Sequence, residues 1–269
     1  MAEVIFHFSS FIFHLSSFIF HLSSFIFHFS MKYSYEFEIK YQEVDDRKKL
    51  RLFNLENYLL EVAGKVADEL GFGIAQLHPM GLTWSITRLS VEMTELPGPT
   101  DHIRIETWVE GTAHMLSTRD FRIYSGDRLI GKCKSVWAIL DMEKREIANV
   151  FDLPMFEGHV DGEVLDMTRV RMTTLPEPTG SVPHKIVYSD LDYNKHCNSC
   201  KYLQAMIDAY LPDYYGRTVR LDINYSKEVM LGDELTTHYL VMEDGVQYQQ
   251  KNEAGETSCS AKITITPNP

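Results

Sequence analysis

The sequence predicts an α+β fold made of two tandem halves, each a long helix wrapped by an antiparallel sheet. One strongly amphipathic segment occurs in each half, and the segments around it alternate apolar and polar residues, as strands with one solvated face do. A segment rich in proline and glycine separates the halves. Short sequence matches recur in the same order on both sides of it, which favours one plan used twice.

The first thirty residues are unlike the rest of the chain. A seven-residue unit repeats there and places His7, His14, His21 and His28 at the same phase. No apolar run in it exceeds three residues and no lysine or arginine precedes Lys32, so neither a membrane span nor a secretory signal fits. We expect residues 1–30 to be the translation of an upstream DNA repeat, with the true start at Met31, and to lie outside the native fold.

The first half is expected over residues 31–150. Apolar residues at helical spacing predict a helix near 55–70 that ends at Gly71: Leu55, Leu59, Val62, Ala63, Val66 and Leu70. Alternating segments at 103–109, 119–124 and 132–140 predict long antiparallel strands.

The second half is expected over residues 184–269, after a linker at 151–183 that carries four of the ten prolines. It repeats the order of the first half: a strand near 184–189, a helix near 199–210, and strands near 218–226, 234–243, 246–251 and 257–266.

An overlay of the halves shows where polar chemistry concentrates. Matching Tyr58 to Tyr202 sets Lys48, Leu50 and Leu52 of the first half against Asp192, Asn194 and His196 of the second. A second match, of Arg88 to Arg220, sets Leu96 against Glu228. The overlay therefore predicts that acid, amide and imidazole groups occur in the second half alone.

These residues have two interpretations. Alternate residues of an extended segment share a side, so Asp192, Asn194 and His196 can converge on one site. The same residue types also suit a turn with a helix cap, and Glu228 alone suits a solvated strand end. A zinc site at His196, Cys197 and Cys200 lacks a second ligand pair, so we expect no metal and no other cofactor.

The chain resembles the acyl-acyl carrier protein (acyl-ACP) thioesterases, the plant fatty-acid chain-terminating enzymes and their bacterial relatives. The resemblance covers residues 33–266 and rests on these motifs: Trp84-Ser-Ile-Thr-Arg88, Thr107-Trp-Val109, Arg119-Asp120, Ser135-Val-Trp137, Ser189-Asp-Leu-Asp-Tyr-Asn-Lys-His196, Lys201-Tyr202 and Tyr225-Ser-Lys-Glu228. It implies a double hotdog fold and hydrolysis of fatty acyl-ACP in fatty acid biosynthesis. It also implies that Asp192, Asn194, His196 and Glu228 are catalytic.

The chain departs from the family at one position. Many plant members have a cysteine after the glutamate, whereas this chain has Val229. Direct attack by water is therefore expected, with Asn194 donating to the carbonyl oxygen, Asp192 orienting the imidazole, and either Glu228 or His196 as the base. An apolar tunnel for the acyl chain is expected largely in the first half.

Composition limits the partners and the compartment. A net charge of −12 argues against nucleic acid and anionic membranes, and four sparse cysteines favour a reducing cytoplasm. The resemblance implies an acidic acyl carrier protein as partner, and the basic run Arg47–Lys49 is its expected docking surface. A homodimer through the sheet edges stays open.

Three alternatives remain at this point: a hotdog acyl-CoA thioesterase, a hotdog dehydratase acting on the same acyl carriers, and a non-catalytic module that binds acyl chains.

Overall fold

The computed structural model describes residues 31–113, 115–149, 153, 155, 158–168, 170 and 172–268. The expectations for residues 1–30 fall outside this part of the chain. The description below concerns the unit that begins at Met31.

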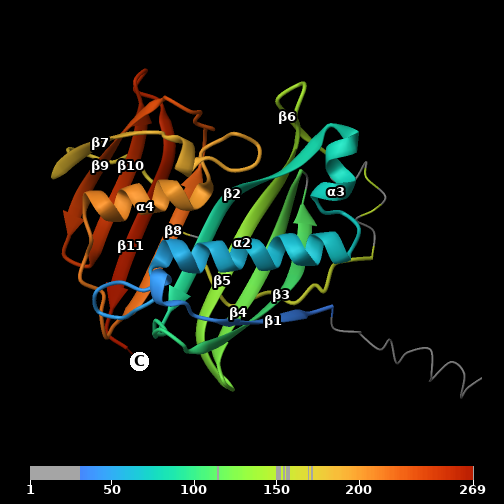
Figure 1. Ribbon diagram of the computed structural model, residues 1–269, viewed down its shortest axis with the longest axis horizontal. Helices are drawn as coiled ribbons and strands as arrows, with labels where there is room; N and C mark the ends of the chain where they lie inside the picture. Colours follow the sequence, from blue (N-terminus) through green and yellow to red (C-terminus); the bar gives the residue numbers. More distant parts are fainter. Residues whose placement is uncertain are drawn as a thin grey trace, which may run out of the picture. The chain divides into compact units, whose positions relative to one another are not determined.

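Within the described residues, eleven strands form one antiparallel sheet (Figure 1). The first half contributes β1 (Tyr33–Glu38), β2 (Leu82–Met93), β3 (His102–Ala113), β4 (Leu116–Ser125), β5 (Arg128–Asp141) and β6 (Glu146–Ala148). The second half contributes β7 (Gly180–Lys185), β8 (Thr218–Tyr225), β9 (Glu234–Met242), β10 (Gly245–Asn252) and β11 (Thr257–Thr266). The strand order is β1-β3-β4-β5-β2-β8-β11-β10-β9-β7, with β6 beside β5, so the pairing of β2 with β8 joins the halves.

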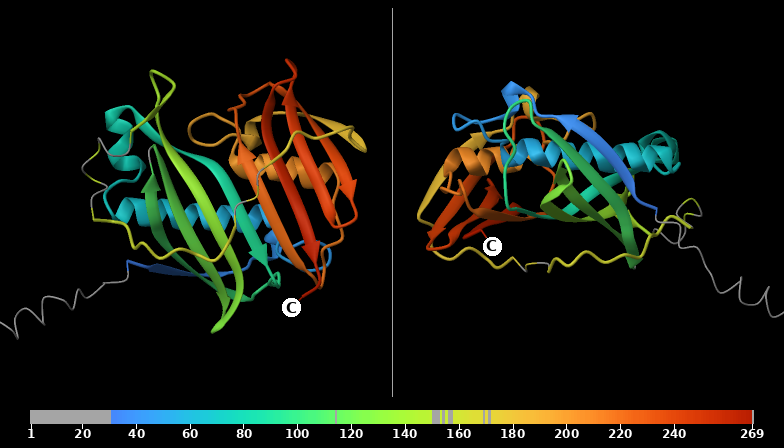
Figure 2. Two further views of the ribbon diagram at one scale, coloured as in Figure 1. Left: turned by 180° about the vertical axis from the view of Figure 1, so that it is seen from behind. Right: turned by 90° about the horizontal axis from the view of Figure 1, so that it is seen from below.

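One main helix crosses the sheet in each half, on the same face (Figures 1 and 2). Helix α2 (Leu52–Glu69) buries Leu55, Leu59, Val62 and Val66 against the first-half strands, as their spacing predicts. Helix α4 (Ser199–Ala209) is shorter, and Asn198 caps its N-terminus. A short helix, α3 (Ile74–Leu77), and the 3₁₀ turns η1 (Tyr41–Glu43), η2 (His78–Met80) and η5 (Tyr188–Asp190) complete the described set. The predicted α+β double hotdog is confirmed.

The start of the second half differs from the expectation. The strand predicted near 184–189 is β7, which begins at Gly180 and ends at Lys185. It ends early because the Asp190 carboxylate accepts a hydrogen bond from the backbone N–H of Val187 at 3.0 Å and draws the chain into η5. Helix α2 likewise begins at Leu52, ahead of the predicted start near 55.

The segment between the halves packs against the sheet face that the helices leave uncovered (Figure 2). The indole N–H of Trp108 donates to the Glu163 carbonyl at 2.8 Å, and the Gln247 amide donates to the Thr173 carbonyl at 2.8 Å. Leu165 and Leu175 are buried there. The segment therefore covers the outer face of both halves as well as joining them.

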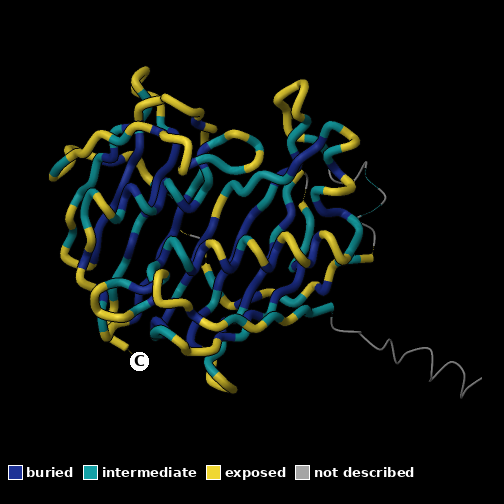
Figure 3. The backbone as a smooth tube through the Cα atoms, in the orientation of Figure 1, coloured by how far each residue is buried: buried dark blue, intermediate teal, exposed yellow. Residues whose placement is uncertain are grey.

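The inner faces of the two halves are filled differently. Buried residues recur along the strands of both halves (Figure 3). In the second half, Tyr248 and Gln250 are fully buried under α4, where the Tyr248 hydroxyl donates to the Tyr210 carbonyl at 2.5 Å and the Gln250 amide donates to the Tyr202 carbonyl at 3.1 Å. In the first half, a large cavity lies beside α2.

Candidate active site

The three clustered polar residues of the second half lie in one turn that leads into α4. The N–H of Asp192 donates to the His196 carbonyl at 2.8 Å, and the N–H of Lys195 donates to the Asp192 carbonyl at 3.0 Å. The Asp192 carboxylate accepts from the backbone N–H groups of Asn194 and His196 at 2.8 and 3.1 Å. Asp192 thus fixes the backbone that carries the amide and imidazole groups.

The first half contains the same turn, formed by Asp45–Lys49. The Asp45 carboxylate accepts from the N–H groups of Arg47 and Lys49, both at 2.9 Å. Lys48 and Lys195 hold the same place in the two turns and both have positive φ, 59° and 66°.

The structural match therefore sets Asp45, Arg47 and Lys49 against Asp192, Asn194 and His196. The expected match of Lys48, Leu50 and Leu52 is wrong, because it followed a tyrosine shared by the helices, whereas hydrogen bonds define the turn. The expectation that the acid occurs in one half alone is wrong as well. The amide and the imidazole do occur in the second turn only.

The match of Leu96 to Glu228 holds in the structure. The N–H of Leu50 donates to the Pro97 carbonyl in the first half, and the N–H of Cys197 donates to the Val229 carbonyl in the second, both at 2.8 Å. The residue before each carbonyl is Leu96 in one half and Glu228 in the other. The second half has a carboxylate where the first has a buried leucine.

Glu228 lies between two nitrogen-bearing side chains. Its Oε1 is 3.5 Å from Nδ1 of His196, and its Oε2 makes an ion pair with the Arg145 guanidinium. Arg145 belongs to the turn between β5 and β6 and has a φ of 59°. A β-bridge between His196 and Met230 holds the two second-half segments together. Both oxygens of the carboxylate are therefore engaged.

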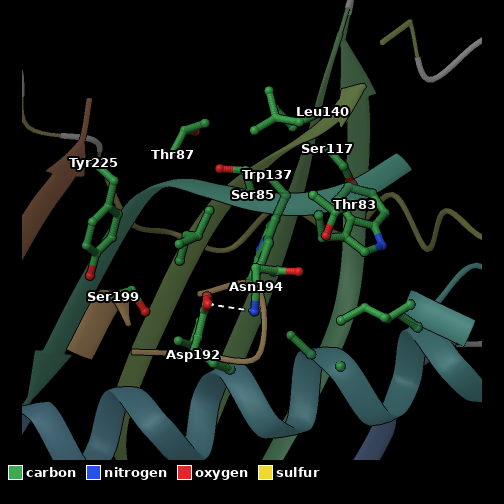
Figure 4. Close-up of a pocket in the computed structure, with 18 of the residues that line it drawn as sticks. Thr83, Ser85, Thr87, Ser117, Trp137, Leu140, Asp192, Asn194, Ser199 and Tyr225 are labelled. Carbon is green, nitrogen blue, oxygen red and sulfur yellow. Dashed lines mark hydrogen bonds between the residues drawn. The ribbon is translucent and has the colours of Figure 1, made fainter. Parts of the chain in front are cut away.

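The polar groups line a cavity of about 1030 Å³. Asp192, Asn194, His196, Glu228 and Arg145 all contribute to its wall. Figure 4 shows Asn194 and Asp192 facing the space under β2 and β5, beside α2. The rest of the wall comes mainly from the first half and includes these apolar side chains: Leu60, Ala63, Ala67, Phe72, Trp84, Val109, Trp137 and Leu140. Such a volume is at the upper end of small-molecule sites.

A buried acid lies where α2 meets the second half. Glu56 accepts a hydrogen bond from the Tyr225 hydroxyl at 2.5 Å, and Tyr225 lines the cavity. Burial raises the pKa of Glu56 to about 7, because the charged carboxylate loses its hydration. The next residue, Asn57, accepts a hydrogen bond from the Cys200 thiol at 2.7 Å. These two contacts tie α2 to the end of β8 and to the start of α4.

The cysteines of the turn and helix are poor nucleophiles. Burial raises the pKa of the Cys197 thiol to about 12 and that of Cys200 well above its usual value. The thiolate, which is the reactive form, is therefore scarce at neutral pH. Val229, at the family's cysteine position, is itself buried.

The structure brings together all four site residues expected from the sequence and adds one that the sequence did not indicate. Arg145 is 83 positions from its partner Glu228. It belongs to no recognised motif, and the only local signal was a pair of cations, Lys144 and Arg145, in a hairpin turn.

Two kinds of site are absent from the described residues. No group of three or more His, Cys, Asp and Glu side chains there could hold a metal ion. Among the helices of that part of the chain, none is long and apolar enough to cross a membrane.

Curated proteins similar to the chain are plant thioesterases. An oleoyl-acyl carrier protein thioesterase of Coriandrum sativum is 24% identical over 201 residues, which cover 66% of this chain and 54% of the relative. An oleoyl-acyl carrier protein thioesterase of Arabidopsis thaliana is 23% identical over 235 residues, covering 77% of this chain and 64% of the relative. The chain thus spans less than two thirds of the length of these relatives.

Two solved structures share the fold over nearly their whole length. An acyl-ACP thioesterase from Bacteroides thetaiotaomicron is 28% identical, with a TM-score of 0.79 over 89% of this chain and 99% of the other. The 12:0-ACP thioesterase from Umbellularia californica, at 18% identity, has a TM-score of 0.75 over 88% and 98% of the two chains.

Family models give the assignment directly. The acyl-ACP thioesterase N-terminal domain matches residues 30–153, and the acyl-ACP thioesterase C-terminal domain matches residues 178–267. Together they account for most of the chain and fall on the two halves that the sheet joins at β2 and β8. The chain belongs to the acyl-ACP thioesterase family.

Proposed function

We propose that the protein hydrolyses fatty acyl-ACP to free fatty acid and ACP, terminating chain elongation in fatty acid biosynthesis. One observation carries the proposal: a mainly apolar cavity of about 1030 Å³ has an amide, an imidazole and a carboxylate in its wall. The cavity suits an acyl chain, and the three polar groups suit the attack of water on a thioester carbonyl.

Asn194 is the proposed oxyanion donor. When water adds to the carbonyl carbon, negative charge develops on the oxygen, and a positioned amide N–H stabilises that charge. The N-terminus of α4 begins directly after Asn198 and adds positive potential on the same side. The Asp192 carboxylate supports this arrangement by holding the backbone N–H of Asn194.

His196 is the proposed base, with Glu228 as its partner. The Glu228 Oε1 faces Nδ1 of His196, and Arg145 occupies Oε2. A carboxylate beside Nδ1 favours the tautomer that leaves Nε2 as the proton acceptor and stabilises the imidazolium that forms. The water proton goes to His196, the C–S bond breaks, and the thiolate takes up a proton. The low pKa of a thiol makes it a ready leaving group, so help for this last step is secondary.

The proposal also covers the partner protein and the cellular compartment. We infer that an acyl carrier protein delivers the chain and that the protein works in the cytoplasm. The four cysteines are free and buried, in keeping with a reducing compartment. A homodimer would use the edge strands β1 and β7, whose outer sides carry no strand within the described residues.

An assay with three thioester classes tests the proposal. The purified protein is incubated with saturated acyl-ACP, the matching acyl-CoA, and an enoyl-ACP, and the products are separated by mass. We expect free fatty acid and ACP from acyl-ACP at the highest kcat/KM. Faster release from acyl-CoA would indicate an acyl-CoA thioesterase, interconversion of enoyl and hydroxyacyl thioesters would indicate a dehydratase, and binding without turnover would indicate a non-catalytic module.

A further inference from the structure

An exposed group of apolar side chains lies beside the active site, on the second half. We define the apolar patch as Val187, Tyr188, Met230 and Leu231, which are 47%, 85%, 44% and 58% exposed. Two hydrogen bonds hold its two segments side by side: Gly232 N–H to the Ile186 carbonyl at 3.0 Å, and Ile186 N–H to the Asp233 carbonyl at 2.9 Å.

The patch adjoins the catalytic groups. Met230 pairs with His196 in a β-bridge, and Cys197 donates to the carbonyl of Val229, which directly follows Glu228. A molecule resting on the patch would therefore lie next to the end of the cavity where the thioester must be held.

The first half supplies an internal comparison, because it builds the same two segments. In the first half, the Lys40 N–H donates to the Glu43 carboxylate at 2.7 Å. In the second half, the Val187 N–H donates to the Asp190 carboxylate at 3.0 Å. Likewise, the Gly98 N–H donates to the Asp101 carboxylate at 2.7 Å, and the Met230 N–H donates to the Asp233 carboxylate at 2.9 Å.

The residues at the patch positions nevertheless differ. Where the second half has Val187, Met230 and Leu231, the first has Lys40, Gly98 and Pro99. Tyr41, at 74% exposed, matches Tyr188. The shared backbone does not require the three apolar side chains, so they need another reason. Exposed apolar groups clustered at a site often mark an interaction surface.

Charge indicates what covers the patch. Four lysines belong to the segments that form the patch or adjoin it in the chain: Lys185, Lys195, Lys201 and Lys227. Within the described residues, Lys185 and Lys195 have no carboxylate within ion-pair distance, while Lys201 lies 3.9 Å from Asp190 and Lys227 pairs with Glu256. A chain of net charge −12 repels an acidic partner at long range. Lysines close to an apolar centre lower that barrier where the partner must dock.

We propose that the apolar patch is the docking surface for the carrier protein, an acidic helical domain with apolar side chains at its contact. This inference rests on the proposed function, since a carrier delivering a thioester to Asn194 and His196 must sit at this end of the cavity. The basic run Arg47–Lys49 is the competing surface. There Arg47 already pairs with Asp213 at 3.0 Å and stacks on Tyr215 at 4.1 Å, which leaves it less available to a partner.

The test compares matched double variants from the two halves. Tyr188→Ser with Leu231→Ser alters the patch, and Tyr41→Ser with Pro99→Ser alters the equivalent positions of the first half. We measure kcat and KM with acyl-ACP and with the same acyl chain on pantetheine, and binding of fluorescently labelled holo-ACP by anisotropy. The patch variant should raise KM and Kd for the carrier by about tenfold, as loss of central interface contacts does. Hydrolysis of acyl-pantetheine should stay unchanged, and the first-half variant should behave as wild type.

Several results would overturn the proposal. Equal weakening by both double variants, or an equal loss on acyl-pantetheine, would remove the patch as a carrier surface. The proposal would also fail if the patch variant bound the carrier normally while replacement of Arg47, Lys48 and Lys49 by glutamate weakened binding. That result would assign docking to the basic run. If wild type hydrolysed none of the substrates, the proposed function would fail, while carrier binding by the two variants would still decide the surface.

Discussion

In both halves a turn closed by an aspartate leads into the central helix, and the hydrogen bonds of Asp45 and Asp192 are nearly the same. The first turn presents Arg47 and Lys49, and the second presents Asn194 and His196. The first half leaves a cavity beside α2, whereas the second fills the equivalent space with Tyr248 and Gln250. We infer that one half holds the acyl chain and that the other half acts on its thioester.

The comparison also separates structural from chemical roles within the site. A group that occurs in both turns, such as the aspartate, is needed for the turn. A group that occurs only in the second, such as Asn194, His196 or Glu228, is a candidate for chemistry. The first three predictions below pair a second-half residue with its first-half counterpart, and acyl-pantetheine is their substrate so that carrier docking does not contribute.

The largest effect is expected at His196. His196→Ala should lower kcat by about 10³-fold or more, because the base that accepts the water proton is lost. Lys49→Ala, at the matching position, should leave kcat unchanged. Steady-state hydrolysis and the melting temperature of both variants provide the check. Wild-type turnover by His196→Ala would show that the site is assigned wrongly.

Asn194 should give the next largest effect. Asn194→Ala removes the proposed oxyanion donor and should lower kcat by about 10²–10³, with little change in KM. Arg47→Ala is the matched variant and should retain kcat. A rise in KM at constant kcat would instead assign Asn194 to substrate binding.

The aspartates should show a shared structural effect and a difference in activity. Asp192→Ala and Asp45→Ala each leave two backbone N–H groups without their acceptor, so each should lower the free energy of unfolding by about 1–3 kcal/mol. Only Asp192→Ala should also lower kcat, by about 10- to 100-fold, through misplacement of Asn194 and His196. Urea unfolding and kinetics on the same samples give both numbers. An equal activity loss in both variants would contradict a role confined to the second turn.

Glu56 should affect stability far more than turnover. Its pKa in the folded protein, about 7, lies above the usual 4.5. The stabilisation from its neutral form is therefore present below about pH 4.5 and is lost as the pH rises through 7. Glu56→Gln keeps an acceptor for Tyr225 and never ionises, so its stability advantage over wild type should grow from pH 5 to pH 8, by at most about 3 kcal/mol. Leu203, the residue of α4 that matches Glu56 in the second half, is apolar and buried. A pH-independent difference in melting temperature would contradict this account.

The parts of the structure that follow from local patterns could be predicted from the sequence. Apolar spacing located α2 and α4, and alternation located the strands. Asp192, Asn194 and His196 gather because they belong to one turn, and Glu228 was found because the halves repeat. The overlay of the two turns was wrong because it was anchored on a single tyrosine of each helix, and one residue can be aligned at several positions. The hydrogen bonds of the two turns align in one way only.

Long-range contacts could not be predicted. The pairing of Arg145 with Glu228 depends on how the β5–β6 hairpin extends over the second half, and no local pattern encodes that. The packing of the inter-half segment on the sheet likewise depends on Trp108 and Gln247, far away in the sequence.

The division of labour between the halves is tested most directly by filling the cavity from α2. Ala67 is buried on α2 and lines the cavity wall. We would measure kcat/KM of Ala67→Phe and wild type on acyl-ACPs of increasing chain length. We expect long chains to lose most of their kcat/KM while the shortest chains keep theirs, because a phenyl group shortens the first-half cavity and leaves Asn194, His196 and Glu228 in place. An unchanged chain-length profile, or an equal loss at every length, would contradict the claim that the first half holds the acyl chain.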